Sequence, residues 1–197
     1  MHMRKAFENI KHITLRETRY RIVLCSRLGS DDNPVYGECS DPNSKSPMIR
    51  YHVCLKGMRR LDVLIHEMLH ACFWDIDEEG IEESASDIAR ALWRLGWKLD
   101  HEEGCKKPKL KYFSFREKRY KYERVSGLKK GDMGSVTSPL LKNKVLQVRI
   151  SLKGEKELFQ HIKYMLYACF WDFDREAVEE TAEDIARELI RIGYSKT

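Results

Sequence analysis

The sequence predicts an α+β fold of two tandem repeats, each a small, mostly antiparallel sheet followed by two helices, packed together as a pseudo-dimer. Residues 37–96 align without gaps with residues 134–193, so a unit of about 85 residues, the size of a small domain, occurs twice. Each unit opens with runs typical of strands and closes with two segments of helical periodicity. We assign a first repeat at 12–98, a linker at 99–111 and a second repeat at 112–195.

The first expected elements are strands at residues 20–24 and 48–54. Both runs are short, rich in β-branched or aromatic residues, and bounded by Gly, Pro, Asn and Ser, which is typical of strands between turns. The run LRETRYRI at Leu15 matches FREKRYKY at Phe115, so the same strand is expected in both repeats.

Two helices follow in each repeat. After Gly57 the apolar residues recur at helical spacing: Leu61, Leu64, Ile65, Met68, Leu69, Cys72 and Phe73. Asp77 is a fair N-cap for the next helix, whose buried face is expected to carry Ile81, Ala85, Ile88, Ala89 and Leu92. Gly96 predicts the helix end, and Gly193 repeats it in the second unit.

Composition predicts a soluble, cytoplasmic protein without a membrane partner. The chain is 42% hydrophobic and 34% charged with a net charge of +5, a balance that permits an acidic partner but does not demand one. Residues 1–16 lack the apolar core of a secretory signal, and no apolar stretch approaches the roughly 20 residues that span a bilayer. The six cysteines form no CxxC pair, which favours reduced thiols in a cytoplasm.

One segment, 106–130, is strongly basic. It carries eleven Lys or Arg against two Glu, interleaved with Tyr112, Phe113, Phe115, Tyr120 and Tyr122. A basic, aromatic strand can make weak contact with nucleic acid. We favour a plainer interpretation, in which the charges face solvent and the aromatic rings face the core.

The motif with the most chemical content is His66-Glu67-Met68-Leu69-His70. Residues four apart share one face of a helix, so His66 and His70 can present two imidazole nitrogens to one metal ion. Glu67 is turned toward a water on that ion rather than toward the ion itself, as a catalytic base requires.

The following helix offers a third ligand. With 100° per residue, Glu82 falls about 60° from the centre of the buried face and Glu83 about 160° from it. Glu82 is therefore the predicted ligand, with Glu83 as the alternative. His66, His70 and Glu82 would form a His₂Glu site for Zn²⁺ that leaves one position open for water.

The second repeat keeps the apolar residues and loses the ligands. Lys163, Tyr164 and Tyr167 stand where His66, Glu67 and His70 stand in the first, whereas Glu179, the counterpart of Glu82, is retained. Packing alone thus does not require the histidines, and we expect the second repeat to be metal-free and non-catalytic. We also expect the Lys163 ammonium to pair with Glu179, because an unpaired carboxylate between helices would be costly.

These residues resemble compact HExxH zinc metallopeptidases, in particular the ImmA/IrrE-type and SprT-like minimal zincin domains of bacteria and phages. ImmA/IrrE-type proteins carry E-x-x-A-x-x-x-A on the helix after HExxH, which matches Glu82, Ala85 and Ala89 here. SprT-like members use a third histidine that this helix lacks. A resemblance to the Glu-x-x-Ser-Asp pattern of thermolysin-like enzymes, ending at Asp87, would instead make Glu83 the ligand.

The resemblance implies a zinc-dependent, gluzincin-like metallopeptidase that cleaves a protein or peptide through a zinc-bound water activated by Glu67. We expect the strand at 48–54 to pair with an extended substrate, and the chain to be a monomer with an internal pseudo-dimer. The alternative is a non-catalytic regulatory or DNA-binding protein that zinc merely stabilises.

Overall fold

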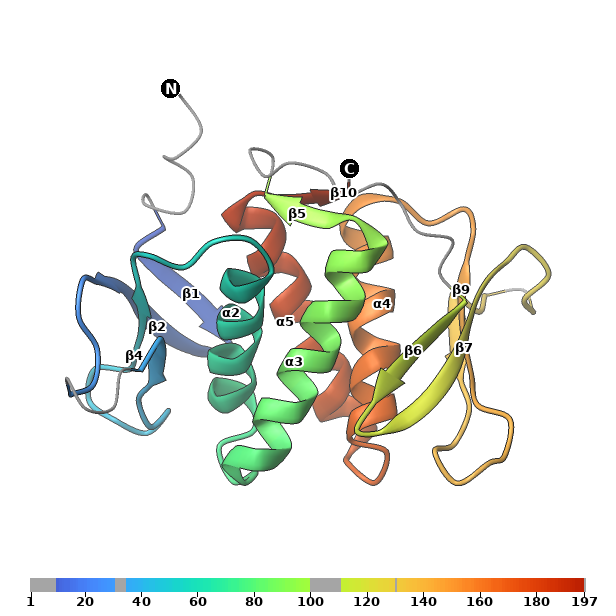
Figure 1. Cartoon of the computed structure of the whole chain (residues 1–197), viewed down its shortest axis with the longest axis horizontal. Helices are drawn as coiled ribbons and strands as arrows, with labels where there is room; N and C mark the ends of the chain where they lie inside the picture. Colours follow the sequence, from blue (N-terminus) through green and yellow to red (C-terminus); the bar gives the residue numbers. More distant parts are fainter. Residues whose placement is uncertain (1–9, 31–34, 100–110, 130, 197) are drawn as a thin grey trace.

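The computed structural model describes residues 10–30, 35–99, 111–129 and 131–196. In Figure 1, helices α2, α3, α4 and α5 stand between two sheets, one with β1, β2 and β4 and the other with β6, β7 and β9. The described part of the chain is therefore α+β with small, mostly antiparallel sheets, as the sequence predicts.

The first half contains one sheet and two helices. Its elements are β1 (His12–Leu15), β2 (Thr18–Cys25), β3 (Gly37–Cys39), β4 (Met48–His52), α2 (Gly57–Cys72) and α3 (Glu78–Leu95). The strand order is β1-β2-β4-β3, in which only the β2–β4 pair is parallel.

The second half has the same strand order and the same mixture of pairings. Its elements are β6 (Tyr112–Phe115), β7 (Lys118–Val125), β8 (Gly134–Val136), β9 (Val145–Arg149), α4 (Gly154–Cys169) and α5 (Arg175–Ile192). In each half the first helix packs against the sheet, and the apolar core runs through all four helices.

The predicted ends of α3 are confirmed. The Asp77 carboxylate accepts a hydrogen bond from the Gly80 N–H at 2.6 Å, which satisfies one of the free donors of the first turn. Gly96 ends the helix in the left-handed region at φ 96°, where a residue with a Cβ would be strained. Asp174 and Gly193 do the same for α5.

The two halves contact each other through equivalent residues. The backbone N–H of Arg16 donates to Asp184 Oδ2 at 2.6 Å, and the N–H of Arg116 donates to Asp87 Oδ2 at 2.8 Å. Both arginines lie in two-residue hairpin turns with positive φ, and no glycine is present to relieve the strain. A bond from each turn to a helix of the other half offsets that cost.

A short ribbon joins the ends of the two halves. Strand β5 (Trp97–Leu99) pairs antiparallel with β10 (Tyr194–Lys196), which follows α5. Leu99, which the sequence places at the start of the linker, belongs to this ribbon. The rest of the predicted linker, 100–110, lies outside the described residues.

The structure corrects one expectation and confirms another. Strand β4 is not free to pair with a substrate, because β2 and β3 flank it; the edge strands of this sheet are β1 and β3. In the described part of the basic segment, Phe113, Phe115, Tyr120 and Tyr122 are buried in the core and Tyr112 is exposed. Four of the five aromatic rings therefore face inward, which is the arrangement that we favoured.

Two further features are plain within the described ranges. The cysteines there, Cys25, Cys39, Cys54, Cys72 and Cys169, are free thiols. None of the helices in these ranges has the combination of length and apolar character that crossing a membrane requires.

Candidate metal centre

His66 and His70 lie on the side of α2 that borders the start of α3. The opposite side of α2 is fixed in the core by fully buried Leu61, Leu64 and Ile65. Both histidine side chains are half-buried, with 20% and 16% of their surface exposed. Their Nε2 atoms are 3.0 Å apart, so both nitrogens face the same small space beside α2.

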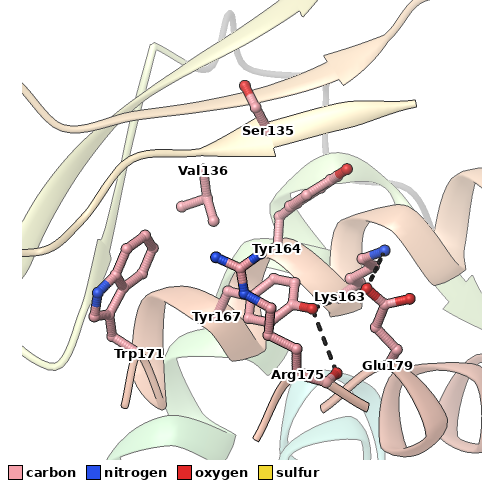
Figure 2. Close-up of a pocket in the computed structure, with 8 residues that line it drawn as sticks. All are labelled: Ser135, Val136, Lys163, Tyr164, Tyr167, Trp171, Arg175 and Glu179. Atoms are coloured by element: carbon pink, nitrogen blue, oxygen red, sulfur yellow. Dashed lines mark hydrogen bonds and ion pairs between the residues drawn. The ribbon is translucent and has the colours of Figure 1, made fainter. Parts of the chain in front are cut away.

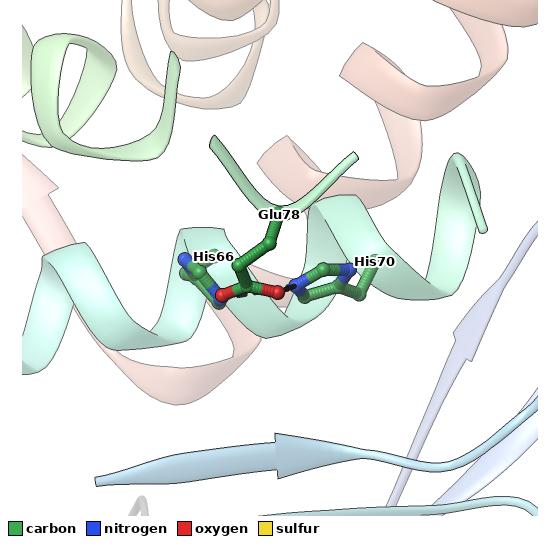
Figure 3. Close-up of side chains that lie close together, drawn as sticks. All are labelled: His66, His70 and Glu78. Atoms are coloured by element: carbon green, nitrogen blue, oxygen red, sulfur yellow. Dashed lines mark hydrogen bonds and ion pairs between the residues drawn. The ribbon is translucent and has the colours of Figure 1, made fainter. Parts of the chain in front are cut away.

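Glu78 completes a group of three ligand atoms. It lies in the first turn of α3, and Figure 3 shows its carboxylate facing both imidazole rings. Glu78 Oε1 is 3.1 Å from His66 Nε2, and Oε2 is 3.0 Å from His70 Nε2. One carboxylate thus bridges both histidines and could join them in holding a metal ion.

These side chains fit a divalent ion such as zinc. Zn–N and Zn–O bonds of 2.0–2.2 Å in a tetrahedron place ligand atoms roughly 3.3 Å apart. The two histidine nitrogens are 3.0 Å apart, and these nitrogens and a carboxylate oxygen of Glu78 all lie within 4.8 Å of one another. Two imidazoles and a carboxylate are also a donor set that zinc accepts, and they leave one position open.

The electrostatics around the histidines favour a cation. Burial, together with the positive potential of His66, lowers the pKa of His70 below its usual value, so this imidazole stays neutral and able to bind a metal. Several carboxylates surround the site. Burial raises the pKa of Glu67, and the negative charges of Glu78 and Glu38 raise it further. Burial also raises the pKa of Asp62, with a smaller contribution from the negative charge of Glu82.

Glu67 lies beside the histidines, underneath β3. Its side chain is 4% exposed, and this burial raises its pKa to about 8. A Cβ atom at Gly37 would overlap Glu67 Oε1 and lie 2.7 Å from Val63 Cγ1. Glycine at the start of β3 is therefore what allows the Glu67 carboxylate to lie against this strand.

The two carboxylates considered from the sequence lie elsewhere in this conformation. Glu82, one turn after Glu78, is exposed and lies near Asp62 rather than in the group of three, so its role as the third ligand stays a prediction. Glu83 does not simply face solvent, because it pairs with Arg116 of the other half at 3.4 Å.

Sequence reasoning missed Glu78. An acidic residue in the first turn of a helix is favoured by the helix dipole in any case, so its position alone does not mark Glu78 as a ligand. A second signal was present, since Glu78 and Glu82 are four residues apart and share one face of α3. If α3 is oriented so that Glu82 faces α2, Glu78 faces α2 as well.

The corresponding place in the second half holds an ion pair. Lys163 Nζ is 2.8 Å from Glu179 Oε1, and the Tyr167 hydroxyl donates to the same oxygen at 2.9 Å. Burial alone would raise the pKa of Glu179, but these two hydrogen bonds lower it overall. The predicted pairing of Lys163 with Glu179 is confirmed.

No family model, curated protein or solved structure matches the chain.

Proposed function

We propose that this protein is a zinc-dependent metallopeptidase whose centre lies between α2 and the start of α3. One observation carries the proposal: two imidazole nitrogens and a carboxylate converge on one point beside a buried second carboxylate, Glu67. The resemblance of the HExxH helix and the helix after it to minimal zincin domains agrees with this assignment.

The ion would be held by His66, His70 and a carboxylate of α3. Glu78 is the carboxylate that contacts both imidazoles in this conformation, and Glu82 is the ligand predicted from the sequence. When bound at such a site, zinc supplies Lewis-acid chemistry, which lowers the pKa of water and polarises a carbonyl group.

Glu67 would act as the catalytic base. Its burial under β3 raises its pKa to about 8, near the neutral range in which a proton acceptor and donor works best. A nearby divalent cation favours the ionised carboxylate. Glu67 would then take a proton from the attacking water and pass it to the amine of the leaving fragment.

The open edge of β3 would align the substrate. Tyr36 O accepts a bond from the His52 N–H, and the Ser40 N–H donates to Met48 O, so residues 36, 38 and 40 face β4. In an antiparallel pair the bonded positions alternate, which turns the main-chain groups of Gly37 and Cys39 outward. An extended peptide paired there would pass directly beside Glu67.

We further propose that the halves arose by duplication and pack as a pseudo-dimer, the second half being non-catalytic. The gapless sequence match and the mirrored Arg16–Asp184 and Arg116–Asp87 contacts support this. Lys163 and Tyr167 cannot replace imidazole ligands at neutral pH, so the second half would stabilise the first.

The alternative, a regulatory or DNA-binding protein stabilised by zinc, has less support. Stacking on nucleic-acid bases needs exposed aromatic rings, and Tyr112 is the exposed one among the five in the basic segment. Its ring also lies under the Arg119 guanidinium at 4.1 Å.

The test combines metal content with a cleavage assay. We expect about one zinc per chain by elemental analysis, lost in His66→Ala and His70→Ala variants. Glu67→Gln should keep its zinc and lose cleavage of an unfolded protein substrate. Glu79→Gln, the same change at an exposed acid of the first turn of α3, should keep both. Cleavage by Glu67→Gln at the native rate would exclude Glu67 as the base.

A further inference from the structure

A pocket of about 320 Å³ lies in the second half, between β8 and the helices α4 and α5. It is lined by Ser135, Val136, Lys163, Tyr164, Tyr167, Trp171, Arg175 and Glu179, and Figure 2 shows these side chains. At an offset of 97 positions, Lys163, Tyr167 and Arg175 correspond to His66, His70 and Glu78. The pocket therefore occupies the place of the candidate metal centre, with cations and phenols instead of its ligands.

The charges lining the pocket leave one cation available. Lys163 and Arg175 are positive and Glu179 is negative, and Glu179 is already paired with Lys163 at 2.8 Å. Among the residues that the structure describes, Arg175 has no ion-pair partner; its guanidinium extends from the start of α5 toward Val136 (Figure 2). A guanidinium among aromatic side chains is suited to hold a carboxylate.

The phenols add hydrogen-bond donors at neutral pH. Burial and the negative potential of Asp132 and Glu179 raise the pKa of Tyr164 to about 12. Burial and the hydrogen bond to Glu179 raise that of Tyr167 as well. Both hydroxyls thus stay protonated. The Tyr167 hydroxyl already donates to Glu179, whereas within the described ranges the Tyr164 hydroxyl donates to no protein acceptor.

An open strand edge runs past the pocket. The Thr137 N–H donates to Val145 O, and Met133 O accepts from the Arg149 N–H, so residues 133, 135 and 137 face β9. The main-chain groups of Gly134 and Val136 consequently face outward, and β8 is the last strand of its sheet. A ligand of this pocket can pair with β8 by main-chain hydrogen bonds.

We propose that the second half binds an extended peptide, which adds to the edge of β8 and places an acidic side chain against Arg175. The strand edge selects a polypeptide, and the unpaired guanidinium selects a carboxylate. The proposed peptide site needs no metal, so peptide binding can be tested independently of the proposed peptidase activity. If that activity holds, the second half would dock substrate segments next to the catalytic half.

Calorimetric titration with blocked heptapeptides tests the proposal. The full-length Glu67→Gln protein, which should not cleave them, would be titrated with a panel of acetylated, amidated peptides of alternating valine and threonine, each with a central glutamate or glutamine. We expect the glutamate peptides to bind at least tenfold more tightly than the glutamine peptides, equally with zinc or with a chelator. N-methylation of the amides flanking the glutamate should weaken binding by at least tenfold.

Arg175→Gln should remove the preference for glutamate. Lys142→Gln makes the same change of charge at an exposed residue of the second half that does not line the pocket, and it should keep the preference. Equal binding of both peptides, no binding of either, or a glutamate preference that survives in Arg175→Gln would overturn the proposal.

Discussion

The Lys163 amino group and the Tyr167 hydroxyl bear on the identity of the third ligand. Both reach further from the backbone than the Nε2 atom of a histidine, by roughly the 2 Å of a Zn–N bond. In the second half they therefore lie about where a metal ion would lie in the first. Glu179, the counterpart of Glu82, contacts both atoms, which indicates that a carboxylate at position 82 can reach the ion.

We therefore expect Glu82→Gln to weaken zinc binding by at least about tenfold, and Glu78→Gln to weaken it less. Glu78 contacts the imidazoles directly in this conformation, but Glu82 is the residue whose counterpart, Glu179, contacts both Lys163 and Tyr167. Competition titrations against a chromogenic chelator would measure both affinities. The opposite ranking would make Glu78 the permanent ligand.

His161 is a second residue at which the halves differ. It is fully buried, its Nε2 is 2.9 Å from the Tyr122 hydroxyl, and the counterparts of these two residues are Leu64 and Ile22. Burial, with smaller contributions from Lys196 and Arg124, lowers the pKa of His161 from 6.5 to about 3. The folded state thus keeps this imidazole neutral where the unfolded chain protonates it.

Because the unfolded state binds the extra proton, the free energy of unfolding should fall as the pH drops from about 6.5 toward 3. One such group contributes a slope on the order of 1.4 kcal/mol per pH unit. The double variant His161→Leu, Tyr122→Ile, which restores the apolar pair of the first half, should lose this contribution. Urea denaturation of both proteins between pH 6.5 and 4.5 would measure the difference, and parallel profiles would contradict the assignment.

The close contact between β3 and α2 at Gly37 should matter for both stability and activity. Gly37→Ala would place a methyl group against Glu67 Oε1 and Val63 Cγ1. We expect a loss of about 1–3 kcal/mol of stability from overpacking. A shift of Glu67 by roughly 1 Å should lower kcat/KM about 100-fold. Thermal denaturation and a peptidase assay would measure the two effects.

Gly127→Ala is the matched control, since nothing lies within 4 Å of its added methyl group and its φ is not positive. It should leave both stability and kcat/KM close to native. If Gly37→Ala retained full activity, the carboxylate of Glu67 would not need its place under β3.

The sequence predicts the long elements of this fold and misses the short ones. Helices α2 and α3 repeat apolar residues over several turns, and α3 is bounded by a side-chain cap and a glycine, so periodicity finds them. Strands β3, β5 and β10 are three residues long, too short for alternation to show. Their pairing depends on partners far away in the chain, as with β5 and β10.

The sequence predicts the part of the site that lies on one helix and misses the part that depends on how two helices pack. Helical spacing places His66 and His70 together, because both lie on one rigid element. The third ligand depends on how α3 crosses α2 and on side-chain rotamers, and neither quantity is encoded in the periodicity of a single helix. Hence Glu78 was missed, although Glu67 and the histidines were found.

The same contact between the two halves occurs twice, once from each half. Each hairpin turn donates a backbone N–H to an aspartate on the second helix of the other half, Asp184 for Arg16 and Asp87 for Arg116. Both aspartate side chains are 14% exposed and also pair with an arginine three residues later. If the halves form a pseudo-dimer, the two contacts should be energetically equivalent.

We expect Asp87→Ala and Asp184→Ala each to lower the free energy of unfolding by on the order of 2 kcal/mol, because each leaves a turn N–H without its charged acceptor. The two losses should agree closely, and the chain should still unfold in a single transition, since each aspartate stabilises both halves at once. Asp172→Ala, at an exposed turn residue, should cost little. Calorimetric scans would show the number of transitions directly. Two separated transitions, or a large loss in one variant and none in the other, would mean that the halves are independent units rather than a pseudo-dimer.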